Sequence, residues 1–147
     1  MLKIFTDGSS RGNPGPGGYG IVMIYKNKRK EISQGYKLTT NNRMELTAVI
    51  KALESVKNEK IKIKIFSDSK YVVESIEKGW IWNWKKKGFK NKQNIDLWKK
   101  FIPLYKKFDV KFEWVKGHDG NIENERCDEL ANISQNENLI EDTGYLN

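Results

Sequence analysis

The amino-acid sequence predicts an α/β fold: one five-stranded mixed sheet, in which an antiparallel three-stranded meander is joined by two parallel strands and flanked by helices. Three strand-like segments, separated by turn-forming residues, precede residue 39. From residue 42 onward, segments with helical periodicity alternate with two short strand-like segments. At 147 residues we expect the chain to form a single domain over 1–147 with its own hydrophobic core.

The N-terminal segments predict the meander. Strands are expected at residues 2–6, 19–25 and 31–38. Residues 7–18 are dense in glycine and proline and predict an irregular, turn-rich loop, and residues 26–30 predict a polar turn. No Gly-Lys-Ser/Thr follows the glycines, so this loop is not a phosphate-cradling P-loop.

The remaining two thirds of the chain predict crossovers between parallel strands. Pro103 is expected to kink the helix that contains it. A polar tail that begins at about residue 137 is expected to be loosely held. The predicted elements are a helix at 42–57, a strand at 61–66, a helix capped by Ser69 or Asp68 through about 77, a short helix at 80–87, a helix that begins at Asn94 or Asp96 and carries Phe108, a strand at 109–115, and a helix from 124 to about 135.

Charge is unevenly distributed along the chain, which carries +8 overall. Residues 119–147 carry a net −7, so residues 1–118 carry +15. Residues 78–107 alone hold ten lysines and one acid. Such a basic segment suggests a polyanionic partner, although a solvated lysine-rich face is the alternative.

Several features bear on the compartment. No apolar run approaches the roughly 20 residues that a membrane helix requires, so no membrane association is expected. Residues 1–7 lack the apolar region of a secretory signal. With Cys127 as its single cysteine, the chain cannot form an internal disulfide. We therefore expect a cytoplasmic protein.

Glu45 stands out because helical periodicity places it among apolar residues. At about 100° per residue it aligns with Val49, Ala52 and Val56. A buried carboxylate is costly unless it is paired, hydrogen-bonded or bound to a metal. A favourable interaction with the helix dipole in the first turn is the alternative. The residues expected to face away are Arg43, Thr47, Lys51 and Glu54.

Four acids are expected to meet at one edge of the sheet. Asp7 and Asp68 each follow a phenylalanine by two positions at the carboxyl end of a predicted strand, where sites form in open α/β sheets. Glu45 can reach the same point, and Asp128 lies at the edge of the inward face of the last helix. Such a cluster suits Mg²⁺, and two divalent ions roughly 3.5–4 Å apart serve in-line phosphoryl displacement. One histidine and one cysteine do not make a zinc site. For each acid alone, a purely structural role remains the alternative.

The chain resembles bacterial type 1 ribonuclease H from end to end. The order and spacing of many short stretches carry this resemblance. They are Phe5-Thr6-Asp7-Gly8-Ser9, residues 12–20, residues 39–46, Ser67-Asp68-Ser69, Asn83-Trp84-Lys85-Lys86, Asp96-Leu97-Trp98, residues 114–118, residues 123–131 and residues 141–145.

The resemblance implies a ribonuclease H-like fold and cleavage of the RNA strand of RNA/DNA hybrids with Mg²⁺ or Mn²⁺, two ions per site when substrate is bound. It implies 5′-phosphate and 3′-hydroxyl products, and we expect a monomer. The implied metal-binding and catalytic acids are Asp7, Glu45, Asp68 and Asp128, with His118 as a further catalytic residue in a loop near the scissile phosphate.

The resemblance also implies how the hybrid is bound. Asn13, Asn41 and Asn42 match positions that contact the minor groove, where 2′-hydroxyls are displayed. Thr40 and Asn94 match positions that hold a DNA phosphate. Trp80 matches an aromatic residue that lines the DNA channel, and Lys85, Lys86 and Lys87 match a basic protrusion at about 79–93.

Three departures from the family pattern affect hybrid binding rather than the reaction. Lys70 stands where many relatives have Gln, so a contact to a base edge becomes a charged one. Leu38 stands where relatives often have Arg, which weakens the phosphate pocket unless Lys37 substitutes. The protrusion is shorter over residues 88–93. The alternatives are a non-catalytic nucleic-acid-binding module and a DNA-cutting nuclease of the same fold.

Overall fold

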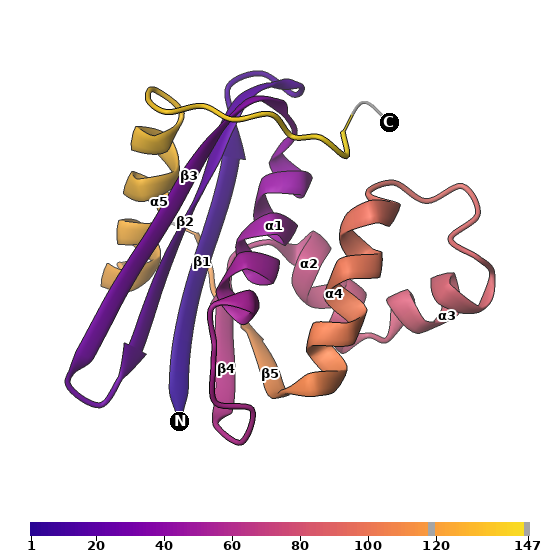
Figure 1. The fold of residues 1–147 in the computed structure, drawn as a ribbon, viewed down its shortest axis with the longest axis horizontal. Coiled ribbons are helices and arrows are strands. Elements are labelled where there is room, and N and C mark those ends of the chain that lie inside the picture. The colour runs from indigo at the N-terminus through magenta and orange to yellow at the C-terminus, as the bar shows by residue number, and fades with distance from the viewer. Residues whose placement is uncertain (118–119, 146–147) are drawn as a thin grey trace.

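The computed structural model describes residues 1–117 and 120–145. Over these residues the chain forms one five-stranded sheet in the order β3-β2-β1-β4-β5 (Figure 1). The strands are β1 (Leu2–Ser10), β2 (Gly15–Tyr25), β3 (Lys28–Thr39), β4 (Lys62–Ser67) and β5 (Asp109–Trp114).

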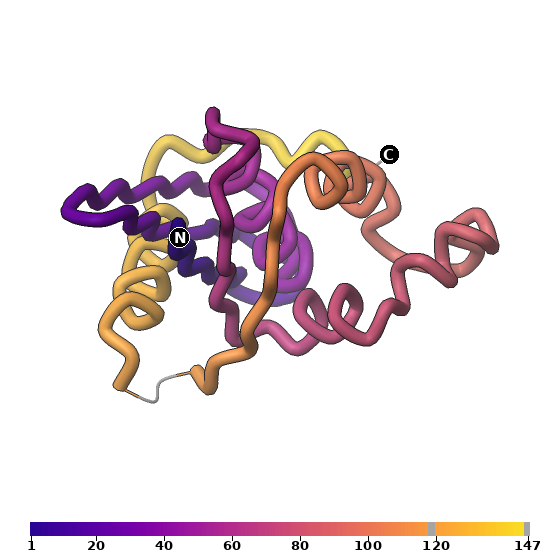
Figure 2. Tube along the Cα trace, turned by 90° about the horizontal axis from the view of Figure 1, so that it is seen from below, coloured from indigo at the N-terminus to yellow at the C-terminus, as the bar shows by residue number. Residues whose placement is uncertain are grey.

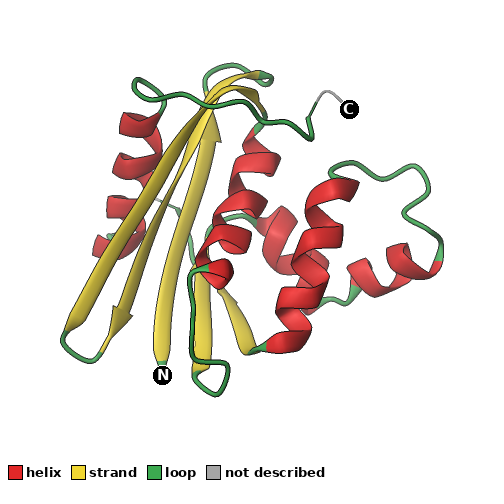
Figure 3. Cartoon of the chain, in the orientation of Figure 1, coloured by secondary structure: helices red, strands yellow, loops and turns green. Residues whose placement is uncertain are grey.

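Helices cover both faces of this sheet (Figure 3). α5 packs on β1, β2 and β3, while α1 packs on β1 and β2 from the other side and also contacts α4. α3 and the loop after it stand away from the sheet beyond α4 (Figure 2). The helices are α1 (Asn41–Glu54), α2 (Lys70–Glu77), α3 (Trp80–Lys86), α4 (Ile95–Lys107) and α5 (Ile122–Ser134).

The strand directions confirm the predicted mixed sheet. β1 pairs with β2, and β2 with β3, in antiparallel register, which makes the meander. β1 pairs with β4, and β4 with β5, in parallel register. The crossovers between these parallel strands carry α1 in the first case and α2, α3 and α4 in the second.

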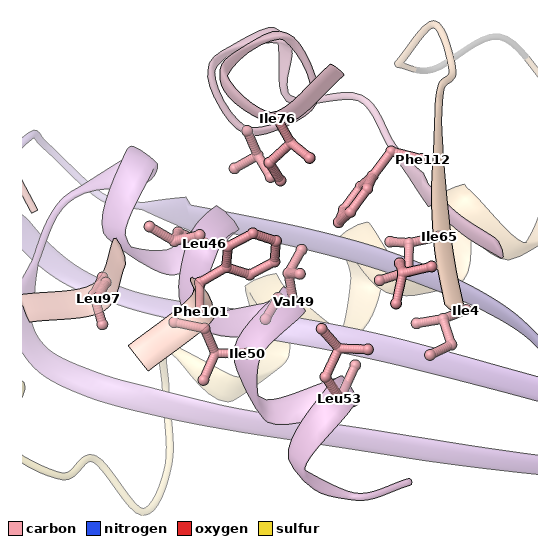
Figure 4. Packing of buried hydrophobic residues seen from close by; sticks show 14 of the residues in the cluster. Ile4, Leu46, Val49, Ile50, Leu53, Ile65, Ile76, Leu97, Phe101 and Phe112 are labelled. Atoms are coloured by element: carbon pink, nitrogen blue, oxygen red, sulfur yellow. The ribbon is translucent and has the colours of Figure 1, made fainter. Parts of the chain in front are cut away.

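Two apolar clusters hold the layers together. The larger one lies between the sheet and α1, α2 and α4, where Ile4, Val49, Ile65 and Phe101 are fully buried (Figure 4). Burying side chains of this kind contributes roughly 1.5–3 kcal/mol each. The smaller cluster lies under α5 and is built from Phe5, Val22 and Cys127.

The prediction of an irregular, turn-rich loop over residues 7–18 was largely wrong. β1 continues to Ser10 and β2 begins at Gly15, so glycines expected to make turns lie in paired strands. A Cβ on Gly20 would lie 2.3 Å from the Cys127 carbonyl oxygen, and one on Gly18 would lie 2.0 Å from Ser134 Oγ. These glycines are required because α5 packs directly on the backbone of β2.

The expectation of a loosely held tail was also wrong. Ile140 forms an isolated bridge with Tyr36, accepting from Lys37 N at 2.9 Å and donating to Gly35 O at 3.1 Å. In Figure 1 the segment after α5 crosses the end of the sheet at which α1 begins. The tail is therefore held to β3 by backbone hydrogen bonds, which its polar composition did not indicate.

Two side chains of α1 lie on a different side from the one expected. Arg43 and Thr47 are buried rather than facing away. The Arg43 side chain is 3% exposed, and its guanidinium forms ion pairs with Asp96 and Asp142, both at 2.7 Å. Helical periodicity treats arginine as a surface residue, and only partners far away in the sequence allow it to be buried.

Several helix ends differ slightly from the expected ones. α1 begins after Thr40, whose Oγ1 accepts from Arg43 N at 3.2 Å, and it ends at Glu54 instead of residue 57. Ser69 caps α2, as predicted. α5 begins at Ile122, two residues early, because Asn121 Oδ1 accepts from Asn124 N. No described helix is both long and apolar enough to cross a membrane.

Candidate active site

The site forms where β1, the central strand, extends beyond the end of its parallel neighbour β4. The pairing of β1 with β4 ends at Thr6 and Ser67, whereas β1 continues with β2 to Ser10. Asp7 therefore lies inside β1, and not beyond its end as predicted, while Asp68 directly follows β4. The rings of Phe5 and Phe66 stack with their centres 4.6 Å apart, which agrees with the predicted alignment of the two strands.

Three acids meet at this point. Carboxylate oxygens of Asp7, Glu45 and Asp68 all lie within 4.8 Å of one another. Glu45 reaches the other two because α1 packs closely on β1: a Cβ on Gly8 would lie 2.4 Å from the Met44 carbonyl carbon. The prediction that Glu45 points inward toward the two aspartates is confirmed.

Burial raises the pKa values of all three acids, and repulsion within the group adds to this for Asp7 and Glu45. Burial, together with the charge of Asp68, raises the pKa of Asp7 to about 8. Burial and then the charge of Asp7 raise the pKa of Glu45 well above its usual range, and burial also raises that of Asp68. The Gly8 N–H donates to Asp7 Oδ1 at 2.9 Å and favours the charged form of Asp7.

One oxygen of Glu45 is suited to a cation. Among the described residues, Glu45 Oε1 is buried and has no hydrogen-bond partner. Native proteins seldom leave a buried carboxylate oxygen unpaired, and a hard divalent cation is a partner that suits it. The three acids can therefore hold a metal ion.

Asp128 lies beside this group but not within it. α5 is placed by the Cys127 thiol, which contacts the Phe5 carbonyl oxygen at 3.2 Å. Asp128 follows Cys127 and lines the same depression as the three acids, and its charge helps to raise the pKa of Asp7. Asp128 is therefore close enough to act on the cluster electrostatically.

The acids open into a shallow depression of about 420 Å³. Strand β1, the first turns of α1 and α2, and α5 form its wall. The lining residues are Asp7, Gly8, Ser9, Asn41, Asn42, Glu45, Asp68, Ser69, Lys70, Tyr71 and Asp128.

The three predicted minor-groove residues occupy the adjoining loop and helix start. Asn41 and Asn42 are exposed and line the depression. Asn41 Oδ1 accepts from Ser10 N at 2.7 Å, and Asn13 Oδ1 accepts from Asn41 N at 3.0 Å. Asn13 thus holds the start of α1 against the β1–β2 loop without lining the depression itself.

The two predicted phosphate-holding residues are linked through Arg43. Thr40 caps α1 over the Arg43 N–H, and Arg43 Nη1 donates to Asn94 Oδ1 at 3.4 Å. Asn94 Nδ2 in turn donates to the Tyr71 hydroxyl at 3.1 Å. Lys37, which could substitute for the arginine that relatives often have at position 38, pairs with Glu141 at 3.3 Å on the surface.

The basic protrusion carries exposed lysines and several aromatic side chains. Trp80 begins α3 with 43% of its surface exposed, and Lys78 Nζ lies 5.3 Å from the centre of its ring. The exposed lysines of the end of α3 are Lys85, Lys86 and Lys87. Lys70 lies near the acids, with Nζ 5.2 Å from the centre of the Trp114 ring.

Sequence reasoning missed Tyr71, Ser9 and Arg43 as parts of this surface. Tyr71 lines the depression and accepts from Trp98 Nε1 at 2.9 Å as well as from Asn94. Its place three residues after Asp68 was the available signal. Nothing local indicated Arg43, since its partners lie 53 and 99 residues away. The predicted catalytic His118 lies outside the described residues.

Comparisons with known proteins agree with this geometry. A family model described as RNase H matches residues 1–135. Ribonuclease H of Trichodesmium erythraeum is 52% identical over 98% of this chain and 95% of its own length. Ribonuclease H of Klebsiella pneumoniae is 50% identical over 99% of this chain and 96% of its own length.

Solved structures show the same fold. LC9-RNase H1, a type 1 RNase H with the type 2 active-site motif, superposes with a TM-score of 0.82 at 28% identity, covering 92% of this chain and 72% of that one. LC11-RNase H1, solved in complex with an RNA/DNA hybrid, superposes with a TM-score of 0.70 at 26% identity, covering 92% and 97%. The family match, the relatives and the acid cluster together lead to one conclusion: the chain belongs to the ribonuclease H family.

Proposed function

We propose that this chain is an endonuclease that hydrolyses the RNA strand of RNA/DNA hybrids with two Mg²⁺ ions, or Mn²⁺ in their place. The observation that carries this is the meeting of Asp7, Glu45 and Asp68 within 4.8 Å, with one buried Glu45 oxygen unpartnered among the described residues. Three carboxylates at this separation repel one another, and hard divalent cations relieve that repulsion.

Each acid has a proposed role that follows from its position. Asp7 accepts a hydrogen bond from the Gly8 N–H, which orients its carboxylate, and it is proposed to be one of the residues that would hold the ions. Glu45, Asp68 and Asp128 complete the set from α1, the end of β4 and α5. When bound, two such ions lower the pKa of an attacking water and stabilise the departing oxygen.

The proposed reaction is an in-line displacement at phosphorus. Water attacks the phosphorus atom, the bond to the RNA 3′-oxygen breaks, and the products carry 5′-phosphate and 3′-hydroxyl ends. His118 is proposed to relay a proton or to assist product release, since the unperturbed pKa of an imidazole lies near neutral pH.

Hybrid recognition is proposed to use the rim of the depression. Asn41 and Asn42 line it, and Asn13 fixes the position of Asn41, which suits contacts to 2′-hydroxyls in the minor groove. Thr40 and Asn94, joined by Arg43, are proposed to hold a phosphate of the DNA strand. The hybrid bound to LC11-RNase H1 supports this choice of partner.

The basic protrusion is proposed to extend the contact along the DNA strand. Trp80 offers an exposed ring, and Lys85, Lys86 and Lys87 offer charges that phosphates neutralise. Lys70 is proposed to contact the hybrid beside the acids. We further propose that the protein acts as a cytoplasmic monomer, in keeping with its single, buried and unpaired cysteine.

A cleavage assay on three duplexes tests the proposal. Labelled RNA/DNA, RNA/RNA and DNA/DNA of one sequence are each incubated with Mg²⁺, with Mn²⁺ and with EDTA. We expect cleavage of the RNA strand of the hybrid alone, and only with a divalent ion. Equal cleavage of DNA/DNA would identify a DNA-cutting nuclease, and binding without any cleavage would identify a non-catalytic module.

A further inference from the structure

Trp114, the last residue of β5, contacts two residues on either side of Ser69 at the start of α2. Its indole Nε1 donates to the Asp68 carbonyl oxygen at 3.1 Å, and its ring lies under the Lys70 ammonium. Trp114 is 43% exposed, so burial in the core does not explain its position. Trp114 therefore links one of the metal-binding acids to a cation beside them.

The contact from Trp114 holds Asp68, which directly follows the last residue of β4. β4 and β5 pair as far as Ser67 and Trp114, and Val115 N adds a last hydrogen bond to Ser67 O at 2.9 Å. Asp68 comes after this pairing, so the indole N–H holds its carbonyl instead of a strand neighbour. A Cβ on Gly117 would lie 2.8 Å from Asp68 Oδ2, so the chain after β5 also passes close to this carboxylate.

The contact to Lys70 places a cation where the helix itself disfavours one. Lys70 is the first residue of α2, after the cap Ser69, and the positive end of the helix dipole repels its charge. Its Nζ lies 5.2 Å from the centre of the Trp114 ring, within the roughly 6 Å over which an aromatic face attracts an ammonium. The ring thereby limits where the flexible lysine side chain rests.

Lys70 also has a special place in the depression. Among the described residues that line it, Lys70 is the one cation, beside Asp7, Glu45, Asp68 and Asp128. An ammonium has three donors, no acceptor and a compact charge, so it is suited to a phosphate oxygen more than to discrimination between base edges. A phosphate of the strand cleaved at the acids would lie within the same depression as Lys70 if that strand occupies it.

We propose that Trp114 is a positioning residue that sets both Asp68 and Lys70, and that the Lys70 ammonium binds a non-bridging phosphate oxygen of the RNA strand next to the cleavage point. This inference rests on the proposed hydrolysis of the hybrid. It assigns to one exposed tryptophan two separable effects, one on turnover and one on substrate affinity.

The affinity effect is tested by the salt dependence of hybrid binding, measured by fluorescence anisotropy in EDTA so that no cleavage occurs. Lys70→Gln should reduce the slope of log affinity against log salt by about 0.7–0.9, the value for one phosphate contact. Trp114→Leu should give a smaller reduction in the same direction, and the double variant should show no larger reduction than Lys70→Gln alone. The matched control is Lys26→Gln, which should keep the wild-type slope. Lys26 lies in the β2–β3 turn, and its Nζ is 5.4 Å from the centre of the Tyr25 ring, so this variant also removes a lysine that contacts an aromatic ring.

The turnover effect is tested with Trp114→Phe, which keeps an aromatic face and removes the N–H donor. At saturating hybrid, kcat should fall by about tenfold, the low end for groups that orient metal-binding residues, with a higher Mg²⁺ requirement. Its salt slope should stay close to that of wild type. Circular dichroism confirms that each variant is folded.

Three results would overturn the inference. An unchanged salt slope in Lys70→Gln would show that Lys70 makes no phosphate contact. An unchanged slope in Trp114→Leu would show that Trp114 does not position Lys70. An unchanged kcat and Mg²⁺ requirement in Trp114→Phe would show that Trp114 does not position Asp68. A wild-type protein that binds but never cuts hybrid contradicts the proposed function instead, and the binding slopes still decide the role of Lys70.

Discussion

Arg43 and Asp142 form an ion pair across 99 residues of sequence, with Arg43 Nε 2.7 Å from Asp142 Oδ2. Asp142 also accepts from Thr39 Oγ1 at 2.7 Å, and Arg43 also donates to both oxygens of Asp96. The pair therefore joins the C-terminal tail to α1, the end of β3 and the start of α4. It also places Arg43 against Asn94, a residue proposed to bind phosphate.

Replacing Asp142 by Ala should destabilise the protein by about 2–4 kcal/mol, because it leaves a buried guanidinium with one carboxylate partner instead of two. Urea unfolding followed by circular dichroism measures this change. The control is Glu141→Ala, which removes an ion pair with Lys37 whose side chains are 66% and 59% exposed and should change stability by less than about 0.5 kcal/mol. Equal effects of the two variants would contradict the role of the buried pair.

Asp7→Asn should stabilise the metal-free protein, and more so at high pH. The pKa of Asp7 is raised in the folded state from 3.8 to about 8, so between these values the folded protein binds a proton that the unfolded chain does not. The wild-type protein therefore loses stability as pH rises through this range. Part of this loss comes from the ionisation of Asp7, and the variant lacks that part because Asn does not ionise. In EDTA the gain should exceed about 1 kcal/mol at pH 9 and vanish near pH 3.

Thermal unfolding of both proteins in EDTA across this pH range checks the sign. A variant that is less stable than wild type at pH 9 would show that Asp7 is held by interactions other than repulsion, and the assignment of a self-repelling acid cluster would fail.

Gly8→Ala should damage both the fold and the acid cluster. The added methyl group would lie 2.4 Å from the Met44 carbonyl carbon and 2.5 Å from Glu45 N, so α1 must move away from β1. We expect a loss of stability of about 1–3 kcal/mol together with a higher Mg²⁺ requirement, since Glu45 moves with α1. Gly88→Asn serves as the stability control: a Cβ there meets no atom within 4 Å, and asparagine tolerates its positive φ.

Changing Lys85, Lys86 and Lys87 to Ala should weaken hybrid binding and flatten its salt dependence, by about 0.7–0.9 in slope for each phosphate that is no longer neutralised. Turnover at saturating hybrid should change little because these residues lie on and just after α3, away from the acids. Anisotropy titrations from low to high salt measure the slope. An unaltered affinity at low salt would mean that these lysines form only a solvated face.

The acid cluster could be predicted from the sequence because its signals are local. Asp7 and Asp68 each stand two positions after a Phe of a predicted strand, and Glu45 interrupts an apolar helical stripe; both patterns need only the period of the element. Parallel pairing of neighbouring strands then brings them together. The antiparallel meander and the parallel direction of the two later strands follow in the same way from short connections and crossovers.

The errors arise where distant segments decide the local structure. Gly18 lies in a stretch with the composition of a turn, and nothing near it in the sequence shows that α5 packs on its backbone. Arg43 has the pattern of a surface residue, since its partners Asp96 and Asp142 are remote. The tail is polar in composition, although Ile140 bonds to β3.

We expect the acid cluster to hold the divalent ions that hydrolyse the RNA strand, and cleavage of labelled RNA/DNA hybrid by wild type and Asp7→Asn at saturating Mg²⁺ is the decisive test of this assignment. We expect rapid cleavage of the RNA strand by wild type, with 5′-phosphate ends, and none detectable by the variant, which remains folded. Cleavage by the folded Asp7→Asn protein within about tenfold of wild type, less than the usual contribution of a single general acid or base, would contradict it.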